Sequence, residues 1–152
     1  AYQHIQPRII VEEYMDVSSD LPLVDYKFHC VNGKIRWLQY IFDRGNHTKE
    51  IIFDKNFSRL DLHLDWDFQR SFVPIKKPKN WEECCQVAEK LAEGLKYVRV
   101  DLYNINNKIF FGEMTFWPLS GCYVSSDIQK FGSMMQFDTD STRDPYISKN
   151  LV

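Results

Sequence analysis

The stretch VRVDLYNINNKIFFGEMTFWP, from Val98 to Pro118, constrains the fold of this chain more than any other segment. It consists of two apolar runs rich in β-branched and aromatic residues, joined by an asparagine-rich turn, which is the pattern of an antiparallel hairpin. The same stretch nevertheless places Asp101 on the first strand and Glu113 on the second. Two carboxylates among so many aromatic residues need a physical explanation.

The register of this hairpin decides whether the two carboxylates share a face, because successive side chains of a strand point to opposite faces. A two-residue turn at residues 106–107 pairs Asp101 with Gly112 and turns Glu113 to the other face. A three-residue loop over residues 106–108 pairs Asp101 with Glu113 instead. Asparagine tolerates the left-handed conformation that such a loop requires, and we favour the three-residue loop.

The favoured register also places Arg99 opposite Thr115, on the same face as the two carboxylates. Like charges directly across a strand pair repel each other. A divalent cation removes this conflict, because hard cations prefer carboxylate oxygens as ligands. The alternative is a solvated strand face on which Asp101 pairs with Arg99. The pattern alone leaves both hypotheses open.

The rest of the sequence predicts an α+β fold, a mostly antiparallel sheet with one main helix packed on it. Asn32-Gly33 is typical of a two-residue hairpin turn, and alternation about it sets Lys27 and His29 on one face of their strand. The helix begins at Asn80, in an N-cap pattern, and carries a buried stripe. Predicted strands occupy residues 7–15, 24–42 (a hairpin), 49–54 and 98–118 (a hairpin), and predicted helices occupy 80–95 and 127–135.

Composition excludes several classes of protein. The 152 residues carry a net charge of −2, which argues against an electrostatic nucleic-acid binder. No apolar run approaches the roughly 20 residues that span a bilayer. The four cysteines include no C-x-x-C pair, so a reducing cytoplasm fits best. We expect one domain at residues 1–137 and a polar tail at residues 138–152.

Three segments together resemble the ATP-grasp fold. VEEYM (residues 11–15) resembles its adenine-binding linker strand, DYKFHCVNGK resembles the following strand, and VRVDLY with GEMTFWP resembles its metal-binding strands. More narrowly, QPRIIVEEYM, DYKFHCVNGK, VRVDLYNINNKIFFGEMTF and P-x-S-G resemble the TupA-like ATP-grasp family. That family is associated with bacterial cell-surface polysaccharide and teichuronopeptide biosynthesis, and its members are sometimes labelled glycosyltransferases, so the resemblance implies a bacterial cytoplasmic protein. The resemblance extends from about residue 6 to residue 132.

The resemblance implies roles for individual residues. Asp101 and Glu113 would ligate Mg²⁺, and Thr115 stands where the family usually has an asparagine, offering a weaker oxygen ligand. Arg99 and Lys27 would face the phosphates of ATP or a developing acyl phosphate. The ribose would meet Asp16 or Asp20. The adenine edge would meet the backbone of four residues: Glu12, Glu13, Tyr14 and Met15.

The segment DRGNHTKE predicts a loop with three donors, Arg44, His47 and Lys49. Such a cluster suits an anionic sugar or a phosphate of a substrate, because loops on rigid scaffolds often carry substrate contacts. The alternative is a solvated polar loop without a binding role. Phe116 and Trp117, which flank the Glu113 motif, are expected to pack in the core.

The resemblance implies an ATP-dependent carboxylate–amine ligase that works through an acyl phosphate on a small-molecule or saccharide substrate. ATP-grasp domains clamp ATP between two lobes, and the lobe with the Gly-rich loop and a lysine precedes the linker strand. We therefore expect this chain to be the C-terminal half, inactive alone, with the N-terminal lobe as its partner. The alternatives are a non-catalytic binding module and a sugar-nucleotide glycosyltransferase. The absence of a D-x-D motif after a strand and of a parallel βαβ pattern counts against the glycosyltransferase.

Overall fold

The computed structural model describes residues 6–12, 15, 23–45 and 47–136. Within them, one sheet has the strand order β4-β3-β2-β1-β6-β7, with β5 paired in parallel to β3 and all other pairs antiparallel. This α+β architecture confirms the predicted fold class. The elements are β1 (Asp25–Val31), β2 (Lys34–Phe42), β3 (Lys49–Phe53), β4 (Arg59–Leu60), β5 (Gln69–Arg70), α1 (Trp81–Leu91), β6 (Tyr97–Ile105), β7 (Lys108–Thr115), a 3₁₀ turn (Pro118–Gly121) and α2 (Ile128–Met134).

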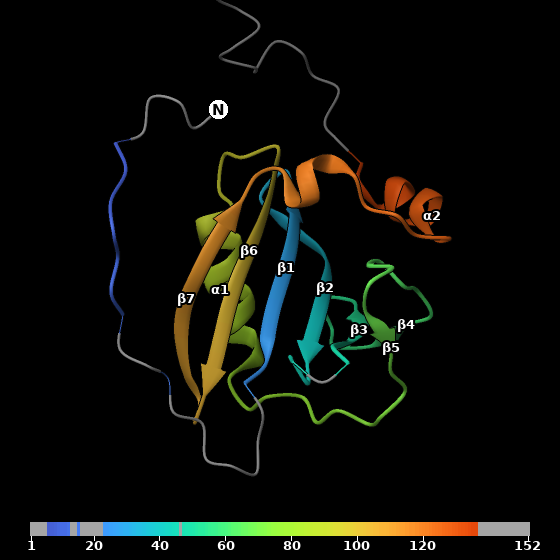
Figure 1. The fold of residues 1–152 in the computed structure, drawn as a ribbon, viewed down its shortest axis with the longest axis horizontal. Helices are drawn as coiled ribbons and strands as arrows, with labels where there is room; N and C mark the ends of the chain where they lie inside the picture. The colour runs from blue at the N-terminus through green and yellow to red at the C-terminus, as the bar shows by residue number, and fades with distance from the viewer. Residues whose placement is uncertain (1–5, 13–14, 16–22, 46, 137–152) are drawn as a thin grey trace, which may run out of the picture.

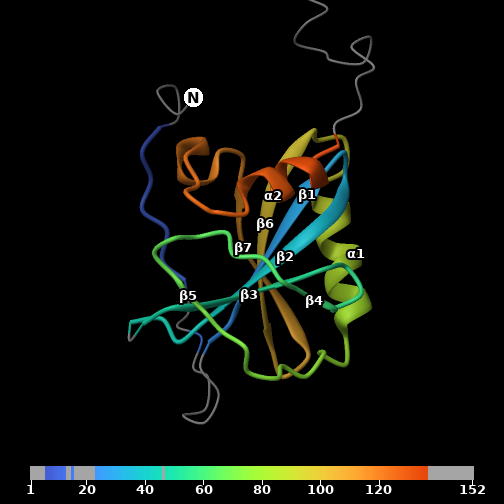
Figure 2. The same ribbon diagram turned by 90° about the vertical axis from the view of Figure 1, so that its right-hand side faces the viewer.

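Helix α1 packs against one face of the sheet, as the two views show (Figure 1, Figure 2). Alternate residues of β1, β2 and β6 point toward it and form the main core with the apolar side of the helix. Phe28 stacks on Trp81 there with ring centroids 5.5 Å apart. The residues of β1 and β6 between these core positions, Lys27 and Asp101 among them, therefore project from the opposite face.

A second, smaller apolar cluster covers part of that opposite face. It consists of Trp37 of β2, Ile52 of β3, Leu64 and Phe131 of α2, all at most 2% exposed. Figure 2 shows α2 on the side of the sheet away from α1. The cluster lies over β2 and β3, so the polar side chains of β1, β6 and β7 occupy the remaining part of the face.

The predicted main helix is present but shorter than expected, ending at Leu91 rather than Leu95. Trp81 is buried as predicted, together with Cys84, Ala88 and the half-buried Leu91. Asn80 takes the N-cap position without a capping hydrogen bond from its side chain. Its amide instead joins α1 to the second hairpin: Nδ2 donates to the carbonyl of Asn107 at 3.1 Å, and Oδ1 accepts from Asn104 at 2.8 Å.

The strand predicted at residues 7–15 is wrong for the part that the structure describes. Residues 6–12 and 15 have no strand hydrogen bonds, and residues 6–12 run as an extended segment apart from the sheet (Figure 1). Ile9, Ile10 and Val11 are 95%, 79% and 90% exposed. A β-branched run becomes a strand only where a neighbour accepts its hydrogen bonds and packs on its side chains, and among the described residues this segment meets none.

The short helix predicted at residues 127–135 is present as α2. The expectation for the residues after β7 is wrong, because Phe116 is 43% exposed and Trp117 is 71% exposed. The predicted tail at residues 138–152 lies outside the described residues. Within the described part, no helix combines the length and apolar character needed to cross a bilayer.

Candidate functional site

The second hairpin pairs Asp101 of β6 directly with Glu113 of β7. The predicted pairing is therefore confirmed, but the predicted three-residue loop is wrong. The turn has two residues, Asn106 and Asn107, with φ angles of 53° and 60°. The extra residue lies in β7 instead, because the ladder shifts between Leu102 and Asp101. This shift is a β-bulge, in which one strand inserts a residue that has no partner of its own.

Gly112 is the inserted residue. A Cβ atom at this position would lie 3.0 Å from the carbonyl oxygen of Asp101 and 3.2 Å from Cε2 of Tyr103, so glycine lets the two backbones approach closely without displacing either group. The bulge also separates Phe111, which pairs with Leu102, from the face that Glu113 occupies. An isolated glycine inside a strand pattern is a recognised bulge signal, and our interpretation of the sequence did not use it.

Five side chains from three strands form a connected cluster beside this bulge. Arg99 donates from Nε to Oδ1 of Asp101 at 2.7 Å and from Nη2 to Oδ2 at 2.8 Å. Its Nη2 also contacts Glu113 and donates to Oγ1 of Thr115 at 3.0 Å. Lys27 of β1 pairs with Asp101 from the other side. The prediction that Arg99, Asp101, Glu113 and Thr115 share one face is confirmed, and Lys27 lies on the same face.

The two carboxylates differ in environment. The side chain of Asp101 is 5% exposed, whereas that of Glu113 is 58% exposed. Burial raises the pKa of Asp101, against the opposing effect of the hydrogen bonds from Arg99 and the charge of Lys27. A hydrogen bond from Thr115, together with the charge of Arg99, lowers the pKa of Glu113. Asp101 is thus held by fixed cations, and Glu113 connects the cluster to solvent.

A histidine of β1 has a purely structural environment beside the cluster. His29 is fully buried, stacks on Trp37 with ring centroids 4.6 Å apart and shares a hydrogen bond of 2.9 Å with the Tyr97 hydroxyl. Burial and the charge of Arg99 lower its pKa well below the ordinary value, so the imidazole is neutral at physiological pH. It packs beside the cluster as an uncharged ring.

The structure does not bring the three loop donors together. Arg44 pairs with Asp25, which precedes Lys27 on the same face of β1, and Lys49 pairs with Asp43 at 2.7 Å. His47 is exposed. Two of the three donors therefore have protein carboxylates as partners, and the predicted substrate role of this loop stays a prediction.

The predicted adenine contacts fall mostly outside the described residues. Glu13 and Tyr14 lie there, as do both candidates for the ribose, Asp16 and Asp20. Glu12 is exposed in the segment that runs apart from the sheet, and Met15 is half-buried. Their roles stay predictions.

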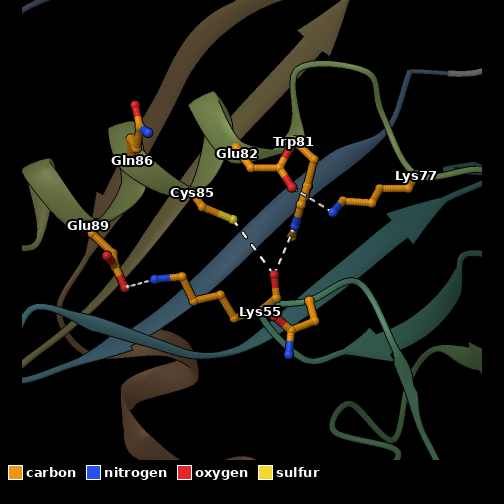
Figure 3. Close-up of a pocket in the computed structure, with 8 residues that line it drawn as sticks. Lys55, Lys77, Trp81, Glu82, Cys85, Gln86 and Glu89 are labelled. Carbon is orange, nitrogen blue, oxygen red and sulfur yellow. Dashed lines mark hydrogen bonds and ion pairs between the residues drawn. The ribbon is translucent and has the colours of Figure 1, made fainter.

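A separate pocket of about 230 Å³ lies beside α1 (Figure 3). Helix α1 covers the face of the sheet opposite to Asp101, so this pocket is distinct from the cluster. The charged side chains of the pocket are already partnered: Lys55 pairs with Glu89, and Lys77 pairs with Glu82. The Trp81 indole donates to the Lys55 carbonyl. Burial raises the pKa of Cys85 to about 12, so its thiol stays protonated. These groups offer neither a free charge nor a nucleophile. The pocket is lined by Lys55, Asn56, Lys77, Trp81, Glu82, Cys85, Gln86 and Glu89.

The family model of the TupA-like ATPgrasp family matches residues 1–132. The chain belongs to the TupA-like ATP-grasp family. Searches of curated proteins and of solved structures each found no match. The match agrees with the resemblance seen in the sequence, and it covers the β1, β6 and β7 strands that carry the cluster.

ATP-grasp proteins generally bind ATP with Mg²⁺, so the cluster can be tested for its fit to that metal. No group of three or more His, Cys, Asp or Glu side chains suited to a metal exists among the described residues. Mg²⁺ does not require one, because it commonly takes one or two carboxylates and completes its shell with water and phosphate oxygens. Asp101, Glu113 and Thr115 supply two carboxylates and a hydroxyl, so the donor chemistry fits Mg²⁺ bound together with phosphates.

Proposed function

We propose that this chain forms the C-terminal half of an ATP-dependent carboxylate–amine ligase, which acts through an acyl phosphate in bacterial cell-surface polysaccharide biosynthesis. Membership of the TupA-like ATP-grasp family supports the use of ATP. The pairing of Asp101 with Glu113 on one face, in contact with Arg99 and Lys27, is the observation that carries the proposal. Such an enzyme would work in the cytoplasm, where ATP is available.

The cluster contains carboxylates that could bind a metal ion and cations that could bind phosphate groups. Lys27 and Arg99 carry two positive charges against the two negative charges of Asp101 and Glu113. When Mg²⁺ is bound, its charge would replace that of the cations at the carboxylates and neutralise phosphate oxygens. Arg99 and Lys27 would then be released from the carboxylates to bind phosphate or acyl-phosphate oxygens. The planar guanidinium of Arg99 is well suited to this role, because it can donate two parallel hydrogen bonds to a phosphate.

The proposed reaction has two steps. An oxygen of the substrate carboxylate attacks the γ-phosphorus of ATP, and ADP leaves. An amine then attacks the acyl carbon and loses a proton to solvent, an amide bond forms, and the bond from the acyl carbon to the bridging oxygen breaks, so that this former carboxylate oxygen leaves with inorganic phosphate. The protein contributes alignment and stabilisation of charge on the transferring phosphoryl group, which account for most catalysis of such transfers. In this fold a second lobe closes over ATP, and we propose that lobe as the partner of the face formed by β1, β6 and β7.

A non-catalytic binding module is the second candidate function. Arg99 bridges both carboxylates and Thr115, and Thr115 stands where the family usually has an asparagine. In this alternative, Arg99 permanently takes the place of the metal and the face binds a partner. No comparable observation favours a glycosyltransferase, because Asp65 of the LDWDF segment accepts the backbone N–H of Asp67 within its own loop.

The experiment compares binding of the fluorescent ATP analogue mant-ATP, with and without Mg²⁺, and ADP formation in the full-length protein. Glu113→Gln preserves shape but removes a ligand charge, so Mg²⁺-dependent binding and ADP formation should be lost while the fold remains. Glu93→Gln is the matched control, since Glu93 is exposed and pairs with Lys90 at the end of α1. Thr115→Asn should retain or strengthen the Mg²⁺ dependence. A folded wild-type protein that does not bind the analogue contradicts the ligase and favours the binding module.

A further inference from the structure

We propose that Gly112 is a positioning residue for this site, because the bulge it forms turns Glu113 onto the face of Asp101. The inference rests on the proposed function, since it assigns Gly112 a role in forming the ATP–Mg²⁺ site. Gly112 itself would contact no ligand. It acts through the register of β7 against β6.

The pairing along the hairpin shows what the bulge changes. From the two-residue turn, the ladder runs regularly from Ile105–Lys108 to Leu102–Phe111. The next regular pair would be Asp101 with Gly112, and Glu113 would then pair with Val100. Val100 is fully buried in the core under α1, so this register would direct the Glu113 carboxylate into an apolar interior. A one-residue slip of a strand moves every side chain to the other face.

The inserted Gly112 shifts the pairing by one residue, which returns the side chains of Glu113 and Thr115 to the face that carries Asp101. After Gly112, Asp101 pairs with Glu113, Val100 with Met114 and Arg99 with Thr115. Met114 then packs at the edge of the core, and Glu113 and Thr115 both reach the Arg99 guanidinium. Bulges near functional sites commonly redirect a side chain in this way.

Glycine fits the bulge for a steric reason. The Cβ of any other residue would approach the carbonyl oxygen of Asp101 to 3.0 Å and the ring of Tyr103 to 3.2 Å. The first of these atoms is backbone, which cannot rotate away as a flexible side chain can. A side chain at position 112 would therefore require the Asp101 backbone or the Tyr103 ring to move by a few tenths of an ångström, and we infer that this displacement disturbs the pairing at Asp101.

Two variants and one control test this role in the full-length protein. Gly112→Ala should remove the cross-strand nuclear Overhauser effects between residues 101 and 113, and should weaken Mg²⁺-dependent mant-ATP binding by about tenfold or more, the usual effect of disturbing the groups that orient metal ligands. Gly132→Ala is the control, because a Cβ at Gly132 in α2 would meet nothing within 4 Å. It should leave both measurements unchanged.

Deletion of Gly112 is the decisive second variant. Without the inserted residue, the two-residue turn leads regularly to the Asp101–Glu113 pair, so both the Overhauser effects and the binding should return toward wild type. The proposal is overturned if Gly112→Ala keeps both signals, for example by moving the extra residue into the turn. It is also overturned if the deletion variant fails to fold or lacks the Asp101–Glu113 contact. The Overhauser effects are measured without nucleotide, so this result is separate from a failure of the ligase proposal.

Discussion

The two long hairpins of the sheet are built in the same way but serve different parts of its open face. The β1–β2 and β6–β7 hairpins both close with two-residue turns in which each residue has a positive φ, Asn32-Gly33 and Asn106-Asn107. Each also carries one bulge in its second strand, where Arg36 and Gly112 are the inserted residues. The backbone arrangement is therefore shared, and the difference lies in the side chain that each bulge redirects.

In the first hairpin the bulge directs an apolar ring, and in the second it directs a carboxylate. Trp37, after Arg36, stacks on His29 and lies 5.0 Å from Phe131 of α2 between ring centroids. Glu113, after Gly112, faces Asp101 and remains more than half exposed. The same kind of bulge therefore extends the covered core on one side of the face and forms a polar, accessible cluster on the other.

The largest effect is expected from removing the buried charge of the second hairpin. Asp101→Asn leaves Lys27 and Arg99 without their shared buried counter-charge, which should lower the free energy of unfolding by about 3–5 kcal/mol. Glu113→Gln, at the exposed side of the same cluster, should cost less than about 1 kcal/mol. Urea unfolding measures both. Equal losses for the two variants would show that the cluster is not divided into a buried and an accessible carboxylate.

The first hairpin should dominate the response to mild acid through His29. Burial keeps this imidazole neutral in the fold, while the unfolded chain binds a proton below about pH 6.5. Stability present above that pH is therefore lost as the pH falls toward the depressed pKa, by up to about 1.4 kcal/mol for each pH unit. His29→Gln should flatten the profile of unfolding free energy between about pH 7.5 and pH 5.5, on either side of the ordinary histidine pKa. An unchanged slope in His29→Gln would refute the buried neutral state.

A substitution in the turn of the first hairpin should have a smaller effect on the free energy of unfolding. Gly33 has a φ of +71°, and a Cβ at this position would lie no closer than 3.5 Å to any neighbouring atom, so the cost of a side chain there is conformational. Gly33→Ala should lower the free energy of unfolding by about 1–2 kcal/mol, the cost of a left-handed conformation for an L-residue, as measured by urea unfolding. Gly132→Ala is the control, and a similar loss in both would contradict the turn argument.

The smallest effect is expected at the other turn. Asn107 has a φ of 60°, which asparagine tolerates and glycine prefers. Asn107→Gly should raise the free energy of unfolding by no more than about 1 kcal/mol, since it relieves part of the left-handed cost. The carbonyl of residue 107 can still accept the hydrogen bond from the Asn80 amide in this variant. A change in the thermal unfolding midpoint should therefore reflect only the conformation of the turn. A clear loss of stability would show that the Asn107 side chain has a role beyond the turn.

The sequence was sufficient to predict much of the fold and the composition of the cluster. The Asn32-Gly33 turn and the helical stripe of Trp81 and Ala88 depend on local chemistry and periodicity, which are visible in a single sequence. The pairing of Asp101 with Glu113 was also predicted, but through the wrong loop. We placed the extra residue in the turn, because we did not consider that Gly112 permits a close approach of the two backbones and can therefore form a bulge.

Other features depended on tertiary context. Asn80 matches an N-cap, yet its amide bonds to Asn104 and the β6–β7 turn, which lie far away in sequence. The apolar run at residues 9–11 has the pattern of a buried strand, but burial requires a neighbour that local pattern does not supply. Trp117 is apolar and exposed, and composition alone does not distinguish such a residue from a core residue.

A crystal structure of the full-length protein with Mg²⁺ and a non-hydrolysable ATP analogue would decide whether the cluster on β1, β6 and β7 is a metal–nucleotide site. We predict that oxygens of Asp101 and Glu113 ligate the metal, and that Arg99 leaves its position between the carboxylates to contact phosphate. A structure in which the nucleotide binds elsewhere, with Arg99 still bridging Asp101 and Glu113, would contradict this assignment.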